Sequence, residues 1–181
     1  RKTIELKPDF FQAHLNLGAV LKDLGQLKEA EIYTRKAIEL NPELASSHLN
    51  LGNILRDLGK LKEAEISFRK AIEINPQCAM AHSNLGNILQ DLDKLKEAKL
   101  STLKAIEIQP DCFSAYFNLG ISYYLLKDNN SALKAIKKAQ TIRQDHKEMM
   151  LLSTILTDLN KIENKHLEID RIKSNFFKQD S

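Results

Sequence analysis

Four asparagines recur at a fixed interval of 34 residues, at Asn16, Asn50, Asn84 and Asn118. Each side-chain amide offers one acceptor oxygen and two N–H donors. These groups complement the N–H and C=O groups that a peptide backbone presents, whatever its sequence. We therefore expect these asparagines to hold an extended peptide, with hydrogen bonding between neighbouring helices as the alternative role.

Three histidines follow the same interval, at His14, His48 and His82, and imidazole nitrogens bind zinc at about 2.1 Å. Equivalent positions of stacked helices lie ~8–10 Å apart, so the three rings cannot share one ion. We expect them to pack between helices instead. The Ser and Cys residues lack a recognisable set of His and acid partners for nucleophilic catalysis. The prediction is a protein that is not an enzyme, with no catalytic, cofactor-binding or metal-binding residues.

Cys78 and Cys112 are also separated by 34 residues. The same helix spacing exceeds the ~7 Å between Cα atoms that a disulfide tolerates. We expect two free thiols in a reducing compartment, and hence a cytoplasmic protein.

The composition excludes several classes of partner. Of 181 residues, 43% are hydrophobic and 28% are charged, with a net charge of +3. The net charge is small, and the sequence contains no basic block of the kind that nucleic-acid binding needs. Trp is also absent. No apolar run approaches the ~20 residues of a membrane span. We therefore predict no nucleic-acid partner and no membrane partner.

The 34-residue interval extends to other residue types, which indicates a solenoid built from one repeated unit. In the unit at residues 45–78, apolar residues at helical spacing from Leu51 predict a helix that Gly59 ends in the left-handed region. A second helix runs from about Leu61 to Ile74, because Pro76 disfavours helix at the residue before it. The fixed positions include Pro8, Pro42, Pro76 and Pro110, Gly18, Gly52, Gly86 and Gly120, and Ala30, Ala64, Ala98 and Ala132.

The alignment of units predicts helix pairs over residues 11–40, 45–74, 79–108 and 113–142. Residues 1–8 match residues 35–42, so we expect a fragment of a longer protein with further repeats upstream. The predicted organisation is residues 1–10 as the end of a truncated preceding repeat, four repeats at 11–44, 45–78, 79–112 and 113–146, and capping helix or helices at 147–181.

The repeats closely resemble the tetratricopeptide repeat family. The resemblance is carried by residues with equivalents in all four repeats, apart from substitutions such as Thr34, Thr102 and Ile136 for Phe68: Leu51, Gly52, Leu55, Ala64, Phe68, Ala71 and Pro76. It implies an all-α, right-handed solenoid of helix-turn-helix repeats. It also implies that the first helices line a concave groove that binds peptides or protein segments.

The recurring asparagines are similar to the asparagine ladder of O-linked N-acetylglucosamine transferase, whose repeats also contain His-x-Asn-Leu-Gly-Asn. At ~10 Å between helices and ~3.3 Å per extended residue, one Asn could hold the peptide backbone about every third residue. Further polar residues on the same helices are expected to rim the groove, with a solvated helix edge as the alternative: Asn53, Asn87, Lys22, Arg56 and Gln90, beside Asp23, Asp57 and Asp91. The basic residues of a chaperone-type carboxylate clamp are not matched, since Leu15, Leu49, Ser83 and Asn84 occupy those positions.

The segment at residues 147–181 departs from the repeat pattern. Its apolar positions alternate in steps of three and four from Leu152, without Gly or Pro. We expect it to cap the apolar end of the solenoid, as one helix or two. Self-association through Phe176 and Phe177 is the weaker alternative, so a monomer is favoured over a homodimer.

These features predict a non-catalytic scaffold that binds a peptide or protein segment in its concave groove. Two alternatives stay open. One is the substrate-recognition arm of a larger enzyme such as a glycosyltransferase, and the other is an assembly adaptor acting through its tail and convex face.

Overall fold

The structure is a computed structural model that describes residues 2–143, 153–158 and 160–161 of the chain. Within these ranges every regular element is a helix. The labelled elements are α1 (Lys2–Leu6), α2 (Phe11–Asp23), α3 (Leu27–Leu40), α4 (Ala45–Asp57), α5 (Leu61–Ile74), α6 (Ala79–Asp91), α7 (Leu95–Ile108), α8 (Phe113–Leu125) and α9 (Asn129–Ile142), and residues 153–158 and 160–161 are helical as well.

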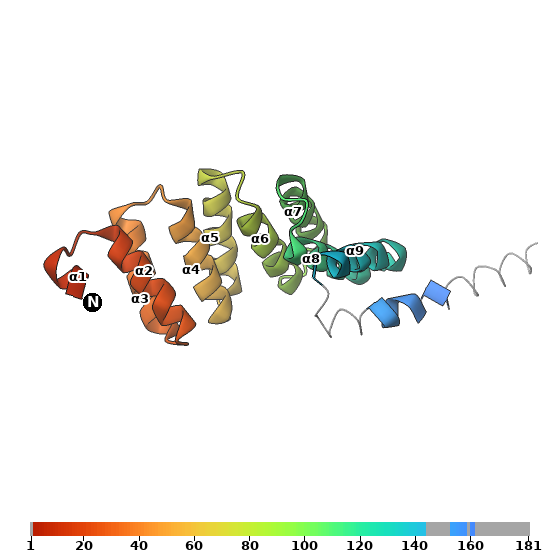
Figure 1. The fold of residues 1–181 in the computed structure, drawn as a ribbon, viewed down its shortest axis with the longest axis horizontal. Coiled ribbons are helices and arrows are strands. Elements are labelled where there is room, and N and C mark those ends of the chain that lie inside the picture. The colour runs from red at the N-terminus through yellow and green to blue at the C-terminus, as the bar shows by residue number, and fades with distance from the viewer. Residues whose placement is uncertain (1, 144–152, 159, 162–181) are drawn as a thin grey trace, which may run out of the picture.

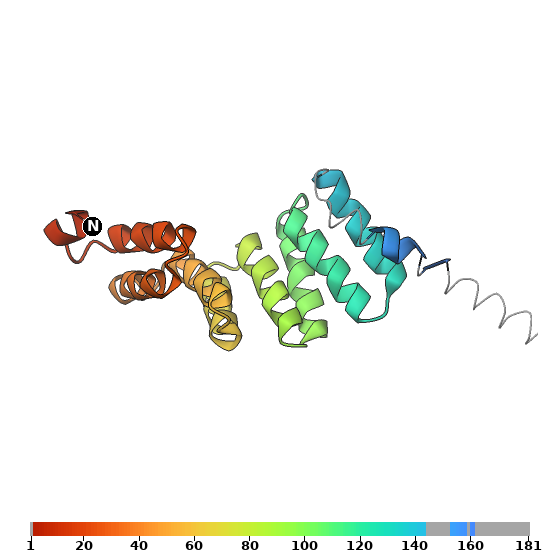
Figure 2. The same cartoon turned by 90° about the horizontal axis from the view of Figure 1, so that it is seen from below.

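Helices α2 to α9 form successive antiparallel pairs that lie in a row along the long axis of the molecule (Figure 1, Figure 2). This arrangement confirms the predicted all-helical solenoid. None of the helices that the structure describes combines the length and the apolar character needed to cross a membrane.

The turn inside each pair depends on one residue in the left-handed region. Gly59 has a φ of 74°. Its N–H donates to Arg56 O at 2.9 Å, and the N–H of Lys60 donates to Leu55 O at 2.8 Å. This Schellman arrangement satisfies the last carbonyls of α4. The equivalent residue is Gly25 in the first pair, but Asp93 and Lys127 adopt the same region in the third and fourth.

The recurring small residues allow the two helices of a pair to approach closely. A Cβ atom added to Gly52 of α4 would lie 2.5 Å from Cε1 of Phe68 on α5, whose side chain is fully buried. The equivalent glycine faces Thr34, Thr102 and Ile136 in the other pairs. The glycine therefore faces the same position of the second helix in every pair, while the residue at that position differs between repeats.

The row of helix pairs curves toward its first helices. Neighbouring first helices contact each other, namely α2 with α4, α4 with α6 and α6 with α8. By contrast, no Cα atoms of successive second helices (α3, α5, α7 and α9) approach within 8 Å of each other. The first helices therefore form the inner, concave surface, and the second helices form the outer surface.

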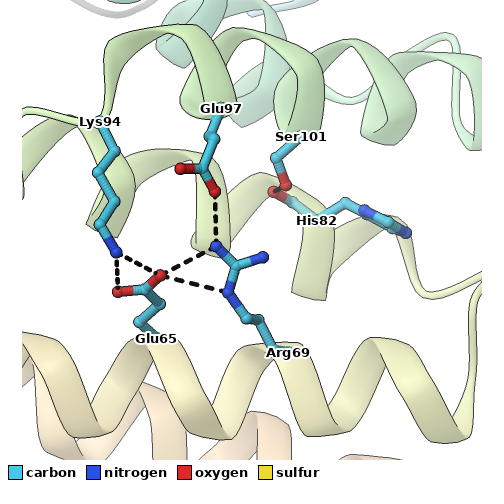
Figure 3. A network of polar contacts seen from close by, with 6 residues as sticks. All are labelled: Glu65, Arg69, His82, Lys94, Glu97 and Ser101. Carbon is cyan, nitrogen blue, oxygen red and sulfur yellow. Dashed lines mark hydrogen bonds and ion pairs between the residues drawn. The ribbon is translucent and has the colours of Figure 1, made fainter.

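Ion pairs connect the separated second helices (Figure 3). Arg69 of α5 bonds Glu65 at 2.9 Å within its own helix and Glu97 of α7 at 2.8 Å. Lys94, which precedes α7, bonds Glu65 at 2.8 Å. Burial alone would raise the pKa of Glu65, but the hydrogen bonds from Lys94 and Arg69 outweigh it and leave this pKa below its ordinary value.

An equivalent set of ion pairs, one repeat earlier, links α3 to α5. Glu31 accepts from Arg35 at 2.9 Å and from Lys60 at 2.8 Å, and Arg35 also reaches Glu63 at 2.8 Å. Here too burial acts to raise the pKa of Glu31, while bonds from Lys60 and Arg35 lower it overall. The outer face is thus more than a solvated surface with charge pairs inside each helix, because its ion pairs also join neighbouring repeats.

The residues described beyond α9 pack against the end of the array. Leu156 is fully buried in a cluster with Ala132 and Ile136 of α9. Gln140 donates to Ser153 at 3.1 Å. The remainder of the predicted cap, including the question of one helix or two, lies outside the described residues.

Candidate peptide-binding surface

The concave surface carries asparagine amides that have no partner of their own. Asn16 on α2 is exposed, while Asn50 on α4 and Asn87 on α6 are half-buried. None of the three side chains has a hydrogen bond to any residue in the described part of the chain. Three successive inner helices therefore each present a free amide.

Asn84 and Asn53 bond to each other across two inner helices. Nδ2 of Asn84 on α6 donates to Oδ1 of Asn53 on α4 at 2.8 Å. This bond fixes the orientation of both amides, and each retains further polar atoms for another partner. The two residues thus contribute to the joint between repeats as well as to the concave surface.

Asn118 is placed differently from its counterparts. Its side chain on α8 is 8% exposed, and Nδ2 donates to the backbone oxygen of Ser83 on α6 at 3.1 Å. Gln90 of α6 in turn donates to Asn118 O and to Ser122 Oγ, the latter at 2.7 Å. Asn118 and Gln90 therefore join the third and fourth repeats, which is the bridging role left open for the asparagines.

Lys22 and Arg56 lie near the ends of their inner helices, where each pairs with the next residue. Nζ of Lys22 is 3.5 Å from Oδ1 of Asp23, and both guanidinium donors of Arg56 reach Asp57 at 2.8–3.0 Å. Each pair brings one positive and one negative charge together, so these pairs add little net charge to the ends of α2 and α4.

The recurring histidines bond to the loops before their helices. Nε2 of His14, His48 and His82 lies 2.7, 2.8 and 3.0 Å from the backbone oxygens of Pro8, Pro42 and Pro76. Each ring therefore links the start of a first helix to the preceding turn by a hydrogen bond. Within the described ranges, no group of three or more His, Cys, Asp or Glu side chains is placed to hold a metal ion.

Cys78 and Cys112 are both free and half-buried. Their positions immediately before α6 and α8 reflect the repeat rather than a shared site. Sγ of Cys112 lies 3.4 Å from Oγ of Ser114.

The outer surface contains hollows that were not anticipated from the sequence. Two of them occupy equivalent places one repeat apart, with volumes of about 410 and 540 Å³. Exposed Ile66 and Leu100 line them, at 68% and 65% exposure. The sequence did contain a sign of these hollows, because an apolar residue recurs among charged ones at Ile32, Ile66 and Leu100.

Comparison with known proteins supports the repeat assignment. Family models described as tetratricopeptide repeat match residues 11–44, 45–78, 81–112 and 113–146. No curated protein matches the sequence.

Solved structures of low sequence identity share the fold. A crystal structure of MamA has a TM-score of 0.73 at 24% identity, covering 79% of this chain and 84% of its own. PilF of Pseudomonas aeruginosa has a TM-score of 0.77 at 23% identity, with coverages of 83% and 69%. A MamA segment from Desulfovibrio magneticus RS-1 has a TM-score of 0.76 at 18% identity, with coverages of 87% and 89%.

These neighbours show the fold alone, whereas the family models cover most of the chain and coincide with its helix pairs. On this evidence the chain belongs to the tetratricopeptide repeat family.

Proposed function

We propose that the chain is a protein-interaction scaffold that binds an extended peptide segment along the concave surface of α2, α4 and α6. Its membership of the tetratricopeptide repeat family supports the role of scaffold. The observation that carries the finer proposal is the set of unpaired amides of Asn16, Asn50 and Asn87.

The amides suit a backbone ligand better than a specific side chain. Each can donate to a peptide C=O and accept from a peptide N–H. Successive inner helices lie ~8–10 Å apart, which corresponds to about three residues of extended chain. The proposed site is similar to the asparagine ladder of the transferase, except that Asn87 takes the place of Asn84 and Asn118 is not part of it.

We also propose a location for the chain in the cell. The free thiols of Cys78 and Cys112 fit a reducing compartment such as the cytoplasm. A monomer is the expected state.

The proposal is tested with a peptide selected on the chain from a phage-displayed library of random peptides. The variant N16A/N50A/N87A removes three amides, each worth about 1 kcal/mol if bonded. We expect titration calorimetry to show up to ~100-fold weaker binding, with an unchanged melting temperature.

The matched control removes three equivalent lysines from the second helices, K28A/K62A/K96A, which lie on exposed positions. This variant should bind the peptide as the natural chain does. Equal affinity in both triple variants would contradict the proposal, and so would a large drop in melting temperature of the asparagine variant.

A further inference from the structure

The hollow on the outer surface recurs a third time, between α8 and α9. It is lined by Tyr116, Leu119, Tyr123, Ser131, Lys134 and Lys138, among others. Each of these residues stands 34 positions after a residue that lines the hollow of the preceding repeat. The third hollow therefore corresponds to the part of the preceding hollow that α6 and α7 form, without the wall that Arg69, Ile72 and Glu73 of α5 add there.

In the preceding repeats the charges around the hollow neutralise one another. Arg69 pairs with Glu97 at 2.8 Å, and Lys104 pairs with Glu107 at 2.7 Å. The apolar wall is completed by Leu100. A charged ligand would have to break these pairs to bind there.

None of the residues that line the hollow between α8 and α9 is acidic. Ser131 replaces Glu97, Thr141 replaces Glu107, and Lys134 replaces Leu100. The lysine equivalent to Lys104 is retained as Lys138. Helix α9 as a whole contains no acidic residue.

The lysines that remain have no partner of their own. Lys134 and Lys138 are exposed, and the ammonium group of neither makes a hydrogen bond or ion pair with any residue the structure describes. A third ammonium group is nearby, since Nζ of Lys99 lies 5.7 Å from the ring centroid of Tyr123. The rim thus concentrates positive charge beside two tyrosine rings.

The carboxylate of Asp128 interacts with these groups, and it is already engaged. Oδ1 of Asp128 accepts from the backbone N–H of Ser131 at 3.0 Å, which caps the start of α9. That Ser131 bond is the main reason why the pKa of Asp128 is lowered, and the charges of Lys134 and Lys99 act in the same direction. Lys134, Lys138 and Lys99 together carry more positive charge than the carboxylate of Asp128 offsets.

The size of the hollow selects among anionic ligands. Its volume is about 260 Å³, below the ~300–1,000 Å³ typical of sites for drug-sized ligands. It can take one large apolar side chain between Leu119 and the tyrosines. A nucleic acid or a bilayer surface would use the lysines without filling it.

We propose that the hollow between α8 and α9 binds an acidic segment of a partner protein, which inserts one apolar side chain between the tyrosines and places carboxylates on Lys134 and Lys138. Complementary charge favours this occupant. The site lies on the opposite face from the asparagine surface, so the two can be tested separately.

The probe is a short fluorescein-labelled peptide with a central leucine flanked by glutamates, followed by fluorescence anisotropy. K134A/K138A should weaken binding by roughly tenfold or more, in line with the loss of two charge contacts. S131E should also weaken it, and it restores the glutamate that the preceding repeats carry at this position. The substitution suits the third position of a helix capped by Asp128, so the fold should be retained.

The matched control is K70A/K104A, which removes the equivalent lysines of the first two hollows and should leave affinity unchanged. A peptide with serine in place of leucine should bind more weakly, and higher salt should reduce binding of the natural chain. Equal losses in the control variant would overturn the proposal. So would tighter binding of a DNA oligonucleotide or of phosphatidylserine vesicles that depends on the same lysines. The variant N16A/N50A/N87A should bind this probe normally, which separates failure here from failure of the concave-surface proposal.

Discussion

Asn16 and Asn118 occupy the same position in their repeats, yet their side chains lie in different surroundings. Asn16 is exposed without a partner, whereas Asn118 is 8% exposed and bonded to Ser83 O. Truncation of an amide that has no partner removes no hydrogen bond from the folded chain. A buried one leaves the oxygen of its partner unsatisfied, which carries a desolvation penalty.

Asn118→Ala is therefore expected to lower the free energy of unfolding by about 1–2 kcal/mol, while Asn50→Ala leaves it unchanged or raises it slightly through better helix propensity. Urea unfolding followed by circular dichroism measures both. Equal effects of the two substitutions would show that burial does not separate the roles.

The asparagines could not be sorted from the sequence, because each partner belongs to the neighbouring repeat. Ser83 stands where the first two repeats have Leu15 and Leu49, so Asn118 faces surroundings that its counterparts do not meet. The bond between Asn84 and Asn53 depends in the same way on the offset between α6 and α4. The sequence predicted which residues recur but could not predict how they pair.

At the scale of helices, the turn inside each repeat keeps one backbone conformation while its residue changes. Gly25 and Gly59 both have a φ of 74°, and Lys127 adopts a φ of 65°. For a residue with a Cβ atom, the left-handed region costs roughly 1–2 kcal/mol. The turn between α8 and α9 is therefore strained relative to the turn between α4 and α5.

Lys127→Gly should stabilise the protein by about 1 kcal/mol by removing this cost, seen as a higher melting temperature in calorimetry. Gly59→Ala is the reciprocal change, since a Cβ there meets no atom within 4 Å and only the backbone is affected. It should destabilise by a similar amount. A stabilising Gly59→Ala would contradict this explanation.

Helices and turns were predictable because their causes are local. Gly59 and Pro76 mark the ends of α4 and α5, and the spacing from Leu51 marks the buried face. The two larger hollows of the outer surface were missed, since each has walls from second helices that are separate in the sequence and do not touch.

At the scale of the whole molecule, the repeats are joined unevenly. Ion pairs of Glu31 and Glu65 connect the second helices of the first three repeats. In the third repeat the equivalents of Glu65 and Arg69 are Lys99 and Leu103, so this network does not continue to α9. The joint to the fourth repeat contains instead the hydrogen bonds of Asn118 and Gln90.

The network predicts a dependence of stability on pH. The pKa values of Glu31 and Glu65 are lower in the folded chain than their ordinary value of 4.5. Their contribution is therefore present above about pH 4.5 and is lost as the pH falls through the folded pKa values. Glu65→Gln should cost about 1 kcal/mol at neutral pH and make unfolding less sensitive to pH between about 5 and 3.

Urea unfolding at several pH values measures this effect, with Asp111→Asn as the control on an exposed carboxylate. The control should keep the pH dependence of the natural chain. An unchanged pH dependence in Glu65→Gln would show that the outer ion pairs do not contribute to the joint between repeats.

The free amides of the concave surface are proposed to hold a peptide backbone. The most direct measurement is a titration of the selected library peptide into the ¹⁵N-labelled chain, followed by the side-chain amide signals in two-dimensional NMR. We predict that the signals of Asn16, Asn50 and Asn87 shift together with saturation while that of Asn118 stays in place. Shifts confined to α3, α5, α7 and α9, with those three amides unchanged, would contradict the claim.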